Sequence, residues 1–158
     1  MASENFHRII VEQFGPSYRL EGPAATAGTI PGMLLQRNAD GSVQPHSDSN
    51  GVVQPAYVAL ETQTPALENV DAIDEEYQNG DTVYLCIPRE GEVLNMWLGA
   101  SRVVSFGDRA SSNGDGTLQT LTVGTDTPPG QIVGVFEESI DNSGGADPVR
   151  ILVRIAGR

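Results

Sequence analysis

Few residue types in this sequence could carry out catalysis. The sequence contains two histidines, His7 and His46, and one cysteine, Cys86. A nucleophilic site needs a serine or cysteine beside a base, and neither histidine lies in a nucleophile motif such as Gly-x-Ser-x-Gly. The 21 acidic residues offer many carboxylate pairs, but none stands out from the others. We therefore expect no enzymatic activity and no catalytic residues, and we expect Cys86 to be a small packing residue.

The sequence also predicts no metal or cofactor site. One cysteine and two distant histidines cannot form a tetrahedral zinc site. The Asn113–Gly116 segment is similar to part of a calcium loop, but Ser111 and Thr122 occupy the positions where such a loop needs an acid and a glutamate. A glycine-rich β-turn is therefore favoured there over a calcium loop. No Gly-x-Gly-x-x-Gly opens a helix and no Walker pattern occurs, so no cofactor is expected.

The charge balance excludes one class of partner. Nine arginines and no lysine stand against 21 acidic residues, which gives a net charge of −12. A phosphate backbone is bound by clustered cations, so we expect no nucleic-acid partner. No apolar run approaches the roughly 20 residues of a membrane helix, so we expect no membrane partner either.

The elements that would position any site are predicted to be short strands. Apolar stretches are brief and end at Gly, Pro, Asn or Asp, a pattern typical of strands and turns. The clearest alternation covers residues 81–87; after a turn at 88–91, residues 92–98 are expected to return antiparallel. Residues 65–80 predict at most one helical turn. Further strands are expected at 7–14, 33–35, 52–61, 102–106, 117–123, 131–137 and 149–155, with a short extended piece from Val43.

About nine short strands joined by such turns favour a barrel or a sandwich. We therefore expect a mainly all-β fold: a compact β-barrel, or a β-sandwich or β-tulip-like domain, with long loops. The length of 158 residues suits one domain. We assign residues 23–158 to that domain and residues 1–22 to an extended N-terminal arm.

The N-terminal arm is more apolar than a free tail should be. Alternation places apolar side chains on both of its faces, which implies burial on both faces. The arm is then either a core strand of its own domain or a segment that docks on a neighbouring subunit, for example by strand addition. The candidate interface residues are Phe6, Ile9, Ile10, Val11 and Phe14.

The order of segments from about residue 26 to 156 resembles the capsid decoration (cement, head-stabilising) proteins of tailed bacteriophages. The resemblance lies in the order of several patterns and not in one diagnostic motif. The segments that carry it are Pro31–Leu34, Val43–His46, Ala56–Glu61, Tyr77–Tyr84, Pro88–Val93, Gly107–Asp108, Ser112–Leu118, Ile132–Glu137, Asp141–Ser143 and Val149–Ile155.

This resemblance implies a non-enzymatic virion protein on the capsid exterior, assembled in the host cytoplasm. Such proteins bind the outside of the expanded capsid and stabilise the head by clamping neighbouring major capsid subunits. The implied partners are the major capsid protein and the chain itself, as a homotrimer at threefold or quasi-threefold sites. An alternative is a virion-displayed carbohydrate-binding or adhesion module, since several loops are rich in Asn, Asp and Ser. A small hydrolase with an Asp/Glu pair is a more distant alternative.

Overall fold

The fold is all-β, as the sequence predicts. A computed structural model describes residues 7–13, 15–16, 18–53, 55–62, 71–122 and 130–156, and within these ranges it contains strands and turns but no helix. No helix long and apolar enough to span a membrane occurs among these residues. The strands are β1 (Ile10–Glu12), β2 (Tyr18–Pro23), β3 (Leu34–Arg37), β4 (Val43–Pro45), β5 (Tyr57–Ala59), β6 (Thr82–Ile87), β7 (Val93–Leu98), β8 (Val103–Val104), β9 (Arg109–Ser112), β10 (Leu118–Thr120), β11 (Gly134–Phe136), β12 (Ile140–Asp141) and β13 (Val149–Ile155).

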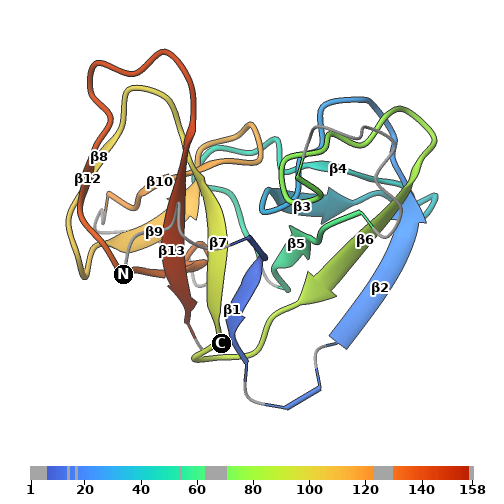
Figure 1. The fold of residues 1–158 in the computed structure, drawn as a ribbon, viewed down its shortest axis with the longest axis horizontal. Helices are drawn as coiled ribbons and strands as arrows, with labels where there is room; N and C mark the ends of the chain where they lie inside the picture. The colour runs from blue at the N-terminus through green and yellow to red at the C-terminus, as the bar shows by residue number, and fades with distance from the viewer. Residues whose placement is uncertain are drawn as a thin grey trace.

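One sheet forms a small closed barrel, on the right in Figure 1. Its strand order is β2-β6-β5-β3-β4. A parallel bridge between Ala24, just after β2, and Val43 of β4 joins the two outer strands. The amide of Ala25 donates to the carbonyl of Val43 over 2.8 Å where the barrel closes. The barrel interior is filled by buried side chains from these strands and from Tyr77: Ala24, Leu35, Val43, Ala59, Tyr77, Val83 and Leu85.

The other sheet also closes on itself. Its order is β1-β7-β10-β9-β11-β13, and β7 pairs with β13 as well. The β7–β13 pairing is antiparallel and continuous from Val149↔Leu98 to Arg154↔Val93. Closure removes most free edges, which otherwise invite edge-to-edge association. The two-stranded ribbon of β8 and β12 extends from this sheet, at the left of Figure 1.

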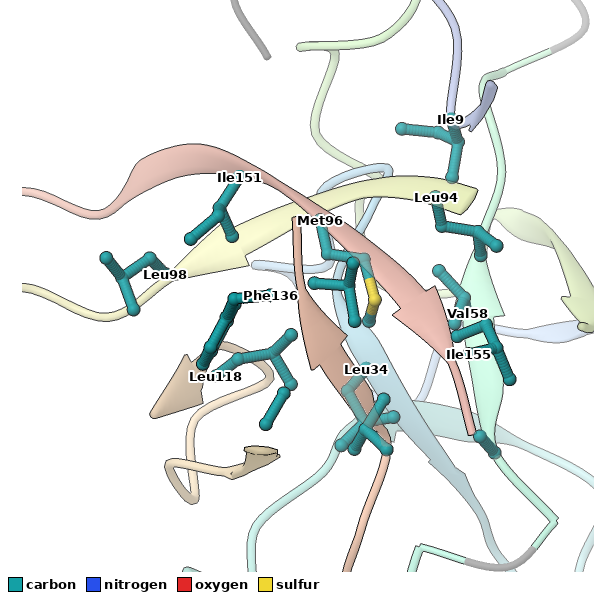
Figure 2. Close-up of a cluster of buried hydrophobic side chains, with 14 of the residues drawn as sticks. Ile9, Leu34, Val58, Leu94, Met96, Leu98, Leu118, Phe136, Ile151 and Ile155 are labelled. Atoms are coloured by element: carbon teal, nitrogen blue, oxygen red, sulfur yellow. The ribbon is translucent and has the colours of Figure 1, made fainter. Parts of the chain in front are cut away.

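The two barrels share a core. The larger hydrophobic cluster contains Leu118, Phe136 and Ile151 from the second barrel, and also Leu34 and Val58 from the first. Figure 2 shows these side chains directed into one common interior. Because apolar side chains from both sheets pack together there, the chain forms one continuous core.

The predicted return of residues 92–98 against residues 81–87 is wrong. β6 pairs with β2 and β5, whereas β7 pairs with β1, β10 and β13. The Pro88–Gly91 segment therefore crosses from one barrel to the other. The face of β6 opposite Leu85 is buried too, with Cys86 in the shared core, because β6 lies at the seam between the barrels.

Other strand predictions differ in extent. The strand expected at 52–61 is limited to β5, and β2, β9 and β12 have no counterpart among the predicted strands. Residues 18–22, predicted to belong to the arm, pair with β6 as part of β2. The sequence of β9, Arg-Ala-Ser-Ser, lacks an apolar alternation; its backbone pairs with β10 and β11 instead.

Candidate functional site

A histidine and a serine meet inside the protein, where sequence patterns predicted no pair. The Nδ1 atom of His46 lies 2.8 Å from Ser112 Oγ, and its Nε2 lies 3.2 Å from the carbonyl oxygen of Val52. A carbonyl can only accept, so Nε2 carries a proton and donates to Val52. His46 is 6% exposed and Ser112 is 0% exposed. The serine oxygen has no surface for a substrate, so this pair fixes the loop after β4 to β9.

The thiol of Cys86 is buried in the shared core. Burial raises its pKa to about 12, with a smaller contribution from the carboxylate of Glu92. Tyr77, in the interior of the first barrel, is also buried, and burial raises the pKa of its phenol to about 12. Both groups therefore remain protonated in the folded protein at neutral pH. This matches the expectation that Cys86 is a packing residue.

These two groups predict an alkaline loss of stability. The usual pKa is 9.0 for a thiol such as Cys86 and 10.0 for a phenol such as Tyr77, and both rise on folding. In the unfolded chain each group loses its proton at lower pH, so the folded state is disfavoured as pH rises above about 9. From Cys86 alone we expect a loss of about 1.4 kcal/mol per pH unit above pH 9. Urea unfolding at a series of pH values from 8 to 10.5 measures this loss of unfolding free energy. Cys86→Ala should flatten the slope between pH 9 and 10, and an unchanged slope would contradict the assignment.

The Asn113–Gly116 loop is a turn closed by its own carboxylate. Asp115 Oδ1 accepts from the Thr117 amide at 3.0 Å and from the Thr117 hydroxyl at 2.5 Å. Gly114 and Gly116 have φ values of +92° and +83°, which favour glycine. Within the residues that the structure describes, no group of three or more His, Cys, Asp or Glu side chains could hold a metal ion.

The arm residues lie partly within the chain's own fold. β1 pairs with β7, with Ile10 opposite Leu94, and Ile9 is 0% exposed. Ile10 is half-buried and packs against the shared core. Val11 is also half-buried, whereas Phe6 and Phe14 lie outside the described residues. Ile9 and Ile10 therefore belong to a strand that packs on the chain's own core. Docking of the arm on a neighbouring subunit stays a prediction.

A largely apolar groove runs along the seam between the barrels. Its volume is about 650 Å³, and it is lined by the end of β6, the segment after it and the end of β13. Tyr18, at the start of β2, forms one wall and is 66% exposed. The remaining lining residues are Pro55, Ala56, Ile87, Pro88, Arg89, Glu90, Val133, Ile155 and Ala156.

No family model matches the sequence, and no curated protein matches it. Among solved structures, the chain is similar to the N-terminal base of the head fiber protein gp8.5 of bacteriophage phi29. The TM-score is 0.54 at 12% sequence identity, and the match covers 89% of this chain and 95% of that chain. At this identity the similarity shows a common fold over almost the whole of both chains.

Proposed function

We propose that this chain is a structural protein of a tailed-phage virion that binds the outer surface of the expanded capsid. The observation that carries this proposal is the fold common to the chain and 95% of a phage head fiber base. The order of sequence patterns from residue 26 to 156, which resembles capsid decoration proteins, supports the same class of protein from separate data.

The proposed mode of action is mechanical and not catalytic. By clamping neighbouring major capsid subunits, the protein would stabilise the head. A homotrimer at threefold or quasi-threefold sites would repeat modest contacts by symmetry, which raises the overall avidity. Two closed barrels around one core supply a rigid body for this task. The net charge of −12 suits a surface that faces solvent outside the shell, away from DNA.

The direct test is a pelleting assay with expanded capsids that lack this protein. The purified chain is mixed with the shells, the shells are pelleted and the bound copies are counted. We expect saturable binding at a copy number set by the lattice symmetry. Unexpanded shells serve as the control and should bind less. Absence of binding to both kinds of shell would overturn the proposal.

The same assay tests the arm. Ile10→Asp would place a charge against the shared core and threaten folding, whereas Val11 is half-buried outside that cluster. We therefore expect Val11→Asp to lower the affinity for expanded shells about tenfold, a loss of about 1.4 kcal/mol. The control is Val52→Asp, the same change at a valine outside the arm that is 59% exposed. This variant should bind the shells as tightly as the parent protein does. Equal affinities for the two variants would remove the arm from the interface.

A further inference from the structure

A small polar hollow lies beside the β8–β12 ribbon, and it shares no lining residue with the groove. Its volume is about 260 Å³. Three stretches that are distant in sequence form it: the loop before β5, the turn between β7 and β8, and the end of β10 with the residues after it. The lining residues are Asn50, Ser101, Arg102, Val103, Gln119, Thr120 and Thr122.

The backbone is unusual at two places in this lining. Within the described residues, Asn50 and Ser101 are the two non-glycine residues with positive φ, at +54° and +57°. Asparagine tolerates this conformation better than serine does. A backbone hydrogen bond fixes each of these residues. The Asn50 amide donates to the Ser112 carbonyl at 2.9 Å, and the Ser101 amide donates to the Gly145 carbonyl at 3.1 Å. Such conformations gather at ligand-binding sites, and here both line one hollow.

Arg102 gives the hollow a positive charge without a paired carboxylate. One terminal nitrogen of its guanidinium donates to Asn113 Oδ1 at 2.6 Å, which fixes the side chain through a neutral partner. Among the described residues Arg102 forms no ion pair, and no acidic residue lines the hollow. Arg150 and Arg154 are paired with acids, whereas Arg102 is exposed and, in the part of the chain that the structure describes, shares the lack of an ion pair with Arg109; its place in the lining of the hollow distinguishes it from Arg109. The guanidinium therefore favours an anion from outside the chain.

The neutral side chains around Arg102 suit hydroxyl groups. Asn50 accepts through Oδ1 from Ser111 and Gln119, and its Nδ2 donates to no described residue. Gln119 donates through Nε2 to Ser49, Asn50 and Ser112, and its Oε1 accepts from no described residue. Ser101, Thr120 and Thr122 complete the lining; the hydroxyl oxygen of Thr120 is buried and has no hydrogen-bond partner among the described residues. Donors and acceptors thus surround one cation, as recognition of a hydroxylated anion requires.

We propose that this hollow binds a single hexuronate, a sugar residue that carries one carboxylate. Arg102 would hold the carboxylate, and the amide and hydroxyl groups would hold the ring hydroxyls. The volume of 260 Å³ is below the roughly 300–1,000 Å³ of sites for drug-sized ligands, which limits the occupant to about one sugar residue. The site would give the protein a glycan-binding activity separate from attachment to a capsid.

The test uses the full ¹⁵N-labelled chain and three small probes, followed by NMR titration. Methyl β-D-glucuronide carries both carboxylate and hydroxyls, methyl β-D-glucoside lacks the charge, and acetate lacks the hydroxyls. We expect the glucuronide to bind about tenfold more tightly than either control probe, with the shifts confined to residues 50, 101–103 and 119–122. A uronate oligosaccharide that binds no more weakly than the glucuronide would identify a polymer as an accessible source.

Two arginine variants locate the charge. Arg102→Gln should weaken glucuronide binding about tenfold. Arg109→Gln removes an exposed arginine that lies outside the hollow, and it should change the affinity less than twofold. The NMR spectrum of each variant verifies that it is folded. Absence of saturable shifts in the parent protein, equal binding of glucoside and glucuronide, or unchanged binding by Arg102→Gln would each overturn the proposal. None of these outcomes depends on capsid binding.

Discussion

Replacing Arg150 by methionine is expected to lower the free energy of unfolding by about 3 kcal/mol. Arg150 lies on β13, and its guanidinium stacks on the ring of Trp97 at 3.9 Å from the centroid. It donates to the carbonyl of Pro31 at 2.8 Å and to that of Ile73 at 2.5 Å. It also forms an ion pair with Asp74 at 2.9 Å. One side chain thus joins the second barrel to two loops outside it.

Arg150 has a large effect because its side chain is only 11% exposed. Burial lowers the pKa of its guanidinium, and the carboxylate of Asp74 opposes that shift. Without the guanidinium, the carbonyl oxygen of Ile73 loses its charged donor, and a buried acceptor without a partner is costly. The carbonyl oxygen of Pro31 loses one of two donors and keeps the indole N–H of Trp97 at 2.9 Å. Methionine retains part of the apolar stem but lacks the guanidinium that stacks on Trp97, so the measured loss reports the polar contacts together with this stacking.

Arg154→Met is the matched control, because Arg154 lies on the same face of the same strand. Its side chain is 38% exposed and pairs with Glu137 at 2.6 Å and Glu12 at 3.3 Å. Exposed ion pairs contribute little, so we expect a loss of about 1 kcal/mol or less. Urea unfolding followed by tryptophan fluorescence and circular dichroism measures both variants. Equal losses for the two variants would mean that Arg150 does not join the loops to the barrel as described.

Gly134→Ala should destabilise the protein by about 3 kcal/mol or prevent the second barrel from closing. Gly134 begins β11, opposite Ile155 on β13 and Ala110 on β9. A β-carbon at this position would overlap the carbonyl oxygen of Arg154 and lie 2.8 Å from Val153 Cγ1. The first obstacle is backbone, so a change of rotamer cannot relieve it. β11 would have to move away from β13.

Gly144→Ala is the control for this change. A β-carbon on Gly144 would meet no atom within 4 Å, so the substitution should change stability by less than about 0.5 kcal/mol. Thermal unfolding by circular dichroism compares the two variants, and hydrogen exchange of the β13 amides locates the effect. A Gly134→Ala protein with parental stability and protected β13 amides would show that the two strands are less closely apposed than described.

Several strands could be predicted because their side chains alternate. The Thr82–Ile87 and Val149–Ile155 strands bury regular apolar positions, and period-2 alternation reports such positions directly. Which strands pair with each other could not be predicted, because pairing depends on residues that are far apart in sequence. The Pro88–Gly91 segment has the composition of a hairpin turn, yet the strands on either side of it find partners in separate sheets. Local sequence holds no signal for that choice.

The His46–Ser112 pair and the polar hollow could not be predicted either, because their residues are also far apart in sequence. His46 and Ser112 are separated by 66 positions, and the hollow gathers residues from 50 to 122. The Asn50-Gly51 pair indicated a turn, but nothing local placed it beside Arg102. Within the arm, apolar residues on both faces predicted burial, and Ile9 is indeed buried. The pattern could not show what the arm packs against, because an apolar face can pack equally well on a sheet of the same chain or on another subunit.

The closure of the two barrels has a consequence for synthesis on the ribosome. All strands of the first barrel lie between residues 18 and 87, so its backbone pairings are available once that stretch has emerged. The second barrel closes only when β13, residues 149–155, can pair with β7 and β11. Until then, the apolar side of β7 lacks its principal cover. A nascent chain stalled after β12 would hence expose the surface that chaperones recognise, whereas one extended past residue 155 would not.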